Sequence, residues 1–145
     1  MTHGIDTDFL VASEILEHPF HRAADALIRR LLKEGHNFAV APQTLAEFIH
    51  IVSDARRMRQ PLSVVDATTR AETWWNAAEV VRVQPDGQSV PNFFNWIQEH
   101  RLGRKRLLDT MLASTFLHAG ILKLVTNNKK DYEVFGCFEI VTYRG

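Results

Sequence analysis

The residues best suited to chemistry are acidic side chains placed where predicted strands end. Asp6 stands in the segment Ile5-Asp6-Thr7-Asp8, at the predicted carboxyl end of the first strand. Aspartate is a poor strand residue, so its presence there favours a functional role. Capping of the following helix by Thr7 or Asp8 explains one of these residues more simply. Parallel sheets bind ligands beyond the carboxyl ends of their strands, which makes this segment a candidate site.

Two further acids lie on predicted helices. Asp109 falls in the first turn of a helix whose predicted buried face includes Leu108, and it borders that face beside Leu112 and Phe116. An acid near a helix N-terminus often only complements the helix dipole. Ionised carboxylates nevertheless avoid apolar neighbours unless they are paired or bound to a metal. Glu47 lies nearly opposite the apolar stripe of its own helix, so the helical wheel alone predicts a solvent-exposed side chain.

A fourth polar segment follows the predicted strand that ends at Thr126. Asn127 and Asn128 tolerate turn geometry, and Asp131 could cap a short helix over 132–135. Each residue therefore has a simple structural explanation. The segment also lies where a substrate crevice opens in a parallel sheet.

Taken together, these acids predict a metal site. Carboxylates that converge on one sheet edge repel one another and take up protons unless a cation holds them. A set of carboxylate, hydroxyl and amide oxygens suits Mg²⁺ or Mn²⁺ better than zinc. Such a site can hydrolyse a phosphodiester by activating a water. The sequence contains no glycine-rich phosphate loop, no GxSxG and no HExxH motif that would indicate a rival site.

The elements that must position these acids indicate an α/β fold, in which a mainly parallel central sheet is flanked by helices as an α/β/α sandwich. Short apolar runs predict strands over 3–7, 37–41, 79–84, 121–126 and 137–143. Helical spacing of apolar residues predicts the helices between them. These helices cover 8–17, 20–34 and 42–56, follow Pro61, begin near Val90, and cover 106–119.

Length and composition are those of one domain over residues 1–145. The chain is 46% hydrophobic and 23% charged, with 17 basic and 17 acidic residues. This composition excludes a disordered class, and the zero net charge argues against binding nucleic acid by bulk charge alone. The single cysteine, Cys137, excludes a disulfide framework within the chain. With neither a secretory signal nor an apolar run near the ~20 residues of a membrane span, we expect a cytoplasmic protein.

Three segments resemble the motifs of PIN-domain ribonucleases, and most closely those of the VapC-type toxins of bacterial toxin–antitoxin pairs. The opening IDTDFLV is similar to the family's first motif, and QTLAEF matches its second. The segment LLDTMLASTFLHAGILKLVTNNKKDYEVFG resembles the C-terminal signature, in which an aspartate opens a helix and T-x-N-x-x-D-F/Y follows a strand. The resemblance covers almost the whole chain, in order and with similar spacing.

The resemblance implies that Asp6, Glu47 and Asp109 are the three core acids of a nuclease site. It implies a divalent cation site, in which Asp6 and Asp109 hold the first Mg²⁺ or Mn²⁺, with Glu47 and Asp131 completing the acidic pocket directly or through water. It also implies an RNA substrate, a small antitoxin protein as partner and a homodimer. The expected reaction is attack of a water on phosphorus, which leaves a 5′-phosphate.

The fourth acid is a separate question. Many relatives have an acid two residues after the strand-end threonine, where this chain has Asn128. Others keep Asn there and supply the acid from the D-F/Y pair, so we assign Asp131 as the fourth acid. Thr126 and Asn128 are expected to assist as hydroxyl and amide groups.

Basic residues cluster before Asp109 and again at Lys129-Lys130. Such clusters are most often solvated surface. Beside a nuclease site, the first cluster would hold RNA phosphates. Its candidate residues are Arg101, Arg104, Lys105 and Arg106.

Two alternatives to a ribonuclease stay open at this point. A PIN fold that binds RNA or a protein without cutting is favoured by Asn128 at a position that is often acidic. A phosphotransfer domain would use Asp6 as a nucleophile and would have little need of Glu47.

Overall fold

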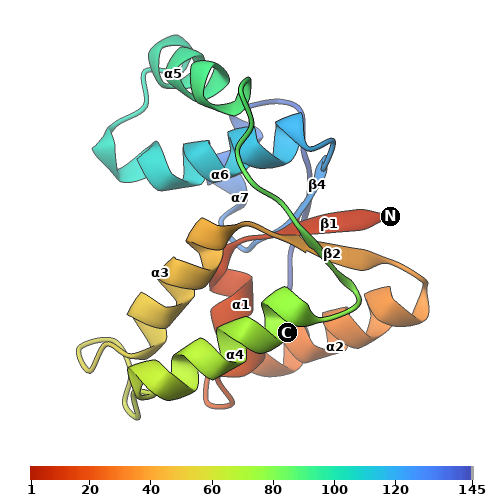
Figure 1. The fold of residues 1–145 in the computed structure, drawn as a ribbon, viewed down its shortest axis with the longest axis vertical. Coiled ribbons are helices and arrows are strands. Elements are labelled where there is room, and N and C mark those ends of the chain that lie inside the picture. The colour runs from red at the N-terminus through yellow and green to blue at the C-terminus, as the bar shows by residue number, and fades with distance from the viewer. Residues whose placement is uncertain (145) are drawn as a thin grey trace.

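The core of the computed structural model, which describes residues 1–144, is a five-stranded sheet whose strands all run parallel (Figure 1). The strand order is β3-β2-β1-β4-β5, so β1 lies at the centre. The strands are β1 (Thr2–Ile5), β2 (Asn37–Val40), β3 (Val80–Arg82), β4 (Lys123–Val125) and β5 (Glu139–Val141). The predicted α/β fold with a parallel sheet is confirmed.

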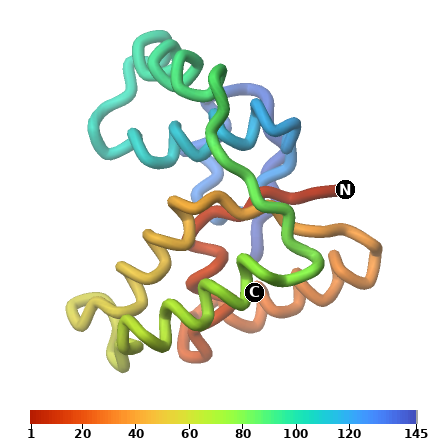
Figure 2. The backbone as a smooth tube through the Cα atoms, viewed as in Figure 1, coloured from red at the N-terminus to blue at the C-terminus, as the bar shows by residue number. Residues whose placement is uncertain are grey.

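Helices cover both faces of this sheet (Figures 1 and 2). Helices α1 to α4 pack on one face, and α5, α6 and α7 pack on the other. The helices are α1 (Thr7–Glu14), α2 (His21–Lys33), α3 (Pro42–Val52), α4 (Val64–Asn76), α5 (Ser89–Glu99), α6 (Leu107–His118) and α7 (Lys129–Glu133), with a 3₁₀ turn η1 (Arg104–Arg106) before α6. No helix within the described residues is long and apolar enough to span a bilayer.

Side chains alternate across the sheet and so build two apolar cores. On β2, Phe38 and Val40 enter the core beneath α1 to α4. Ala39, between them, faces the second core beneath α5 to α7. In that second core Trp96 stacks on Phe135 with ring centroids 4.2 Å apart. Each layer of helices is therefore anchored to the same short strands.

Strand β1 ends two residues earlier than the predicted range 3–7, because Asp6 begins the next helix. Asp6 is the N-cap of α1, and its carboxylate accepts a hydrogen bond from the backbone N–H of Thr7 at 2.8 Å. The capping role that the sequence assigned to Thr7 or Asp8 is thus filled by Asp6. Asp131, expected as a possible cap, lies instead inside α7, for which Asn128 is the capping position.

Gly4 allows α6 to approach the central strand. A Cβ at this position would lie 2.9 Å from both Leu124 Cδ2 and Phe116 Cε2, closer than carbon atoms normally approach. Leu124 lies on β4 and Phe116 on α6. The absence of a side chain at Gly4 therefore sets how close the helix that carries Asp109 lies to the sheet.

Strand register aligns two of the predicted site residues at one edge. Ile5 pairs with Val125, and the backbone N–H of Asp6 donates to the carbonyl of Val125 at 3.2 Å. Asp6 and Thr126 are consequently neighbours just beyond the carboxyl ends of β1 and β4. On the other side of β1, β2 leads within two residues into α3, which begins at Pro42.

Candidate functional site

Asp6 is the most buried of the candidate acids, with 6% of its surface exposed. One carboxylate oxygen accepts from the Thr7 N–H, and the other accepts from the Thr126 hydroxyl at 2.9 Å. Burial, followed by the charges of Asp8 and Asp109, raises the pKa of Asp6 well above its usual value. Two hydrogen bonds therefore hold the side chain in one orientation, one from the residue after Asp6 and one from Thr126 at the end of β4.

Asp8 joins this site, although its position in the sequence suggested only a capping role. Its carboxylate accepts from the backbone N–H of Phe9 at 2.8 Å and from that of Asn127 at 2.9 Å. Burial raises the pKa of Asp8. The hydroxyl of Thr126 lies within 3.3 Å of it as well as near Asp6. A signal was present in the sequence, since Asp8 follows Asp6 by two residues in the first motif.

Glu47 is brought to the site by α3. The hydroxyl of Thr7 donates to Glu47 Oε1 at 2.5 Å, which links the start of α1 to the middle of α3. Glu47 is half-buried, so the solvent-exposed position predicted by the helical wheel is wrong. The wheel describes one helix alone, whereas here a second face of α3 packs beside the end of β1.

Asp109 lies in the first turn of α6 and is partly buried. Burial, followed by the charges of Asp131 and Glu47, raises the pKa of Asp109 to about 6. Arg106 acts in the opposite direction. The neighbouring Leu108, predicted to be buried, is 62% exposed. Asp109 therefore faces carboxylates from α3 and α7 at the end of the sheet.

Asp131 is partnered by Arg106. The Arg106 guanidinium lies 3.6 Å from the Asp131 carboxylate and also donates to its backbone carbonyl. Of the predicted RNA-binding cluster, Arg101, Arg104 and Lys105 are exposed, whereas Arg106 is half-buried against α7. Arg106 thus orients one of the acids.

In the sequence Tyr132 is the aromatic residue of the D-F/Y pair, and no role was expected for it, yet its hydroxyl lies among the acids. Its side chain is 1% exposed, and its hydroxyl has no hydrogen-bond partner within residues 1–144. Burial, followed by the charges of Asp6 and Asp109, raises the pKa of Tyr132. A buried hydroxyl without a partner carries a desolvation cost that a ligand in the site could relieve.

These contacts place acids from four segments around one end of the sheet, but not in one tight cluster. Besides burial, the charges of Asp8 and Asp109 raise the pKa of Asp6. Likewise, the charges of Asp131 and Glu47 raise the pKa of Asp109. Among residues 1–144, no three His, Cys, Asp or Glu side chains lie close enough to hold one ion together. The donors are all oxygens, as Mg²⁺ and Mn²⁺ prefer. The two residues expected to assist the acids differ in burial: Thr126 is buried, whereas Asn128 is exposed.

A family model described as PIN domain matches residues 5–134. No curated protein matches the chain by sequence. Among solved structures, the Mycobacterium tuberculosis toxin VapC20, which cleaves the sarcin–ricin loop, is similar with a TM-score of 0.69 and 16% identity, covering 96% of this chain and 98% of that one. A chain of VapBC2 from Rickettsia felis, bound to a promoter DNA fragment, is similar with a TM-score of 0.70 and 17% sequence identity. The match covers 99% of this chain and 100% of that one. A chain of VapBC-1 from nontypeable Haemophilus influenzae is similar with a TM-score of 0.65 and 15% sequence identity, and the match covers 98% of each chain.

Proposed function

Because this chain belongs to the PIN-domain family, we propose that it is a metal-dependent endoribonuclease similar to the VapC toxins. The observation that carries this proposal is the convergence of carboxylates at the carboxyl edge of the sheet. Burial raises the pKa of Asp6 there, and the charges of Asp8 and Asp109 raise it further. Burial also raises the pKa of Asp109, with further contributions from the charges of Asp131 on α7 and Glu47 on α3. Structural acids are normally arranged to avoid such repulsion, whereas a cation site needs it.

The proposed cation is Mg²⁺ or Mn²⁺. Asp6 and Asp109 would be its first ligands, with Glu47 and Asp131 completing the pocket directly or through water. When bound, such a cation lowers the pKa of a coordinated water and screens the charge of the phosphate. The oxygen-only donor set and the unpartnered Tyr132 hydroxyl fit a hydrated cation at this place.

The residues around the acids hold them in position. The Thr126 hydroxyl and the Thr7 N–H fix the two oxygens of Asp6, so that this carboxylate does not need to reorient when substrate arrives. The Thr7 hydroxyl fixes Glu47. In the proposed reaction a water attacks the phosphorus in line, the 3′-oxygen leaves, and the products carry a 5′-phosphate and a 3′-hydroxyl.

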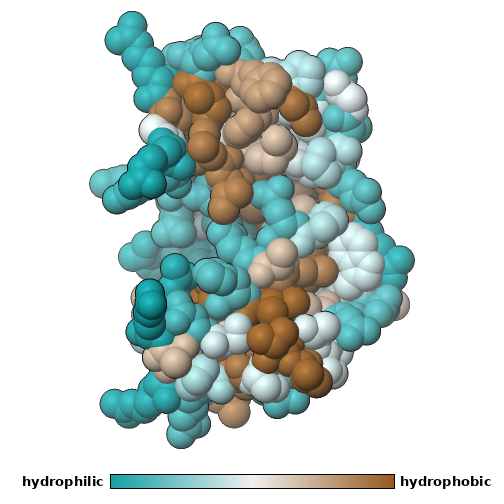
Figure 3. All heavy atoms as spheres, turned by 60° about the vertical axis from the view of Figure 1, so that its left-hand side comes forward, coloured by the Kyte–Doolittle hydropathy of each residue, from teal (hydrophilic) through white to brown (hydrophobic). Residues whose placement is uncertain are grey.

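We further propose that the protein acts with a small antitoxin, as a cytoplasmic homodimer. Two of the similar structures are of toxin–antitoxin pairs, VapBC2 and VapBC-1. Figure 3 shows exposed apolar side chains in two groups on one face, over α5–α6 and over α3–α4. Exposed apolar residues on these helices include Phe94 of α5, Leu108 of α6, and Val64 and Val65 of α4. Exposed apolar groups of this kind mark surfaces for partner proteins.

The test of the proposed function is a calorimetric Mn²⁺ titration of the protein and of Asp109→Asn, followed by an RNA cleavage assay with analysis of the product ends. We expect Mn²⁺ binding that is lost in the variant, and cleavage that leaves a 5′-phosphate. A 2′,3′-cyclic phosphate would contradict the mechanism.

A PIN fold that only binds RNA or protein is the second candidate, favoured by the absence of three closely grouped acids among residues 1–144. For this candidate, RNA would bind but stay intact at every Mn²⁺ concentration.

A further inference from the structure

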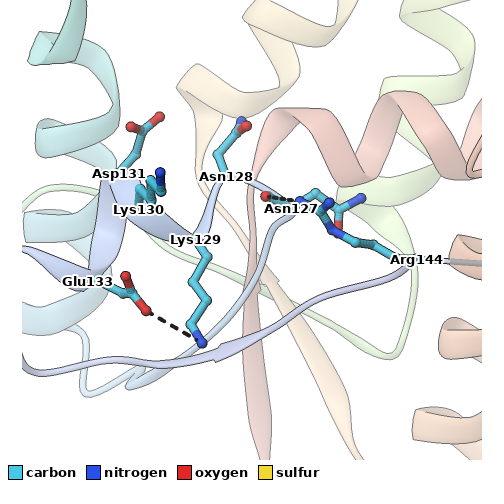
Figure 4. Close-up of a pocket in the computed structure, with 7 residues that line it drawn as sticks. All are labelled: Asn127, Asn128, Lys129, Lys130, Asp131, Glu133 and Arg144. Carbon is cyan, nitrogen blue, oxygen red and sulfur yellow. Dashed lines mark hydrogen bonds and ion pairs between the residues drawn. The ribbon is translucent and has the colours of Figure 1, made fainter.

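A polar pocket of about 530 Å³ opens beside the acids, where β4 passes into α7 (Figure 4). It is lined by residues 127–131 with Glu133 and Arg144. Its volume falls within the range of about 300–1,000 Å³ that is usual for ligand pockets. All the lining side chains are polar or charged, so the pocket suits a charged or strongly polar ligand.

Asn127 fixes Arg144 at the rim of this pocket. Its carboxamide accepts from the Tyr143 N–H at 2.8 Å and donates to the Tyr143 carbonyl at 3.1 Å. The Arg144 guanidinium in turn donates to the backbone carbonyl of Asn127 at 3.1 Å. The N–H of Asn127 donates to Asp8. The same residue therefore contacts Asp8 and also holds Arg144 at the rim of the pocket.

The charges of the pocket leave two cations free. Glu133 is paired with Lys129 at 3.4 Å, and Asp131 is paired with Arg106. Neither Lys130 nor Arg144 forms an ion pair with a carboxylate of residues 1–144. Figure 4 shows Lys130 and Arg144 on opposite sides of Asn128. An anion in the pocket could therefore be approached by cations from two sides.

We propose that this pocket binds a backbone phosphate of single-stranded RNA beside the bond that is cut, with Lys130 and Arg144 as its cations. This inference rests on the proposed function and adds a subsite to it. Acids at the end of the sheet repel a polyanionic substrate, so cations must flank them for RNA to remain bound. The pocket has no aromatic side chain on which a base could stack, which favours a phosphate over a base.

The inference can be tested by RNA binding in the presence of EDTA, which separates binding from cleavage. The probe is a short, fluorescein-labelled single-stranded RNA, followed by anisotropy across a range of salt concentrations. The test variant is Lys130→Gln/Arg144→Gln. The matched control, Arg30→Gln/Lys33→Gln, removes two cations from the end of α2. We expect about tenfold weaker binding by the test variant, and a salt slope lower by about 0.7 for each lost phosphate contact. The control should bind as the wild type does.

Cleavage of a longer RNA with Mn²⁺, measured on the same proteins, distinguishes the two proposals. If the wild type cuts RNA and the test variant binds with unchanged affinity and salt slope, the pocket is not a phosphate subsite and the nuclease proposal stands. If the wild type does not cut but the test variant loses RNA binding, the nuclease proposal fails and the subsite stands. A labelled glutamate-rich peptide that binds more tightly than RNA, and only to the wild type, would overturn the assignment to RNA.

Discussion

The two ends of β1 both bury ionisable side chains, but of opposite type. At the carboxyl end, burial and neighbouring acids raise the pKa of Asp6. At the amino end, His3 is 3% exposed, and its Nε2 lies 3.1 Å from Nδ1 of His36. Burial, followed by the charges of His36 and Lys123, lowers the pKa of His3 to about 4. In both places burial favours the neutral form.

The difference lies in what surrounds each buried group. Around His3 the nearby charges are mostly positive, from Lys123 and the N-terminal amine, while Glu139, which pairs with Lys123 at 3.3 Å, acts in the opposite direction. The histidine is neutral at neutral pH and needs no ion. Around Asp6 the charged groups that shift its pKa are other carboxylates, Asp8 and Asp109. If the carboxyl end holds the proposed cation, its buried acids give up stability for that function, whereas the amino end buries an imidazole that is neutral at neutral pH.

The largest effect that tests this comparison concerns activity. Asp6→Asn and Asp109→Asn each remove one proposed cation ligand, so we expect RNA cleavage to fall by about a hundredfold or more. The measurement is the initial cleavage rate with saturating Mn²⁺. Glu72→Gln, on the exposed surface of α4, is the control and should cut RNA at the wild-type rate. Full activity in both site variants would exclude the acids from the chemistry.

Gly4→Ala tests how far the stability of the protein depends on the close packing of α6 against β1, the strand that joins the two ends compared above. The new methyl group would clash with Leu124 and Phe116, so we expect a loss of about 1–3 kcal/mol in the free energy of unfolding. Urea denaturation measures this change. Gly87→Ala is the matched control, since a Cβ there has no heavy atom within 4 Å. Equal stability of the two variants would show that α6 does not depend on Gly4.

A smaller effect follows from the raised pKa of Asp109. Its pKa is about 6 in the folded protein and 3.8 without the fold. The folded state therefore binds more protons between these values, and stability falls as pH rises from about 4 to 6. Without divalent cations, Asp109→Asn should avoid this loss and be about 1–2 kcal/mol more stable than wild type at pH 7, after allowance for solvent screening.

Urea denaturation in EDTA at several pH values checks this expectation. Added Mn²⁺ should then stabilise the wild type more than the variant, because binding to the folded state adds to its stability. A variant that is less stable than the wild type at every pH would contradict the expectation.

The smallest effect, and of opposite sign, is expected at the amino end. Because the pKa of His3 falls from 6.5 to about 4, the unfolded state binds more protons between these values, and stability falls as pH drops through that range. His3→Gln should flatten this part of the pH profile by about 1 kcal/mol. His50→Gln, exposed on α3, serves as control. An unchanged pH profile in the His3 variant would remove the histidine from the comparison.

Much of the fold could be predicted because its signals are local. The strands are short apolar runs. Of the helices between them, α3 and α5 have proline near their starts, and α2 and α6 are followed by glycine. Their order indicated a parallel sheet, and therefore the edge at which a site would lie. The family motifs then singled out Asp6, Glu47, Asp109 and Asp131, whose roles as ligands remain a prediction.

What could not be predicted depends on contacts between distant segments. A helical wheel treats α3 and α6 as isolated, so it placed Glu47 in solvent and Leu108 in the core, and both placements are wrong. Asp8 was missed because the same residue can hydrogen-bond its own helix and face another strand's end. No role was expected for Tyr132 beyond its place in the D-F/Y pair, because nothing local distinguishes a core tyrosine from one that lies beside carboxylates.

The hydrogen bond between Thr126 and Asp6 joins residues 120 positions apart in the chain. During synthesis, Asp6 leaves the ribosome long before the segment that will become β4. Strand β1 can pair with β2 at that stage, but its other side and its carboxyl end stay open to water. The acids cannot be assembled until residues 123–126 emerge, so an incomplete nascent chain does not yet carry the proposed nuclease site while it is still beside the ribosome's own RNA.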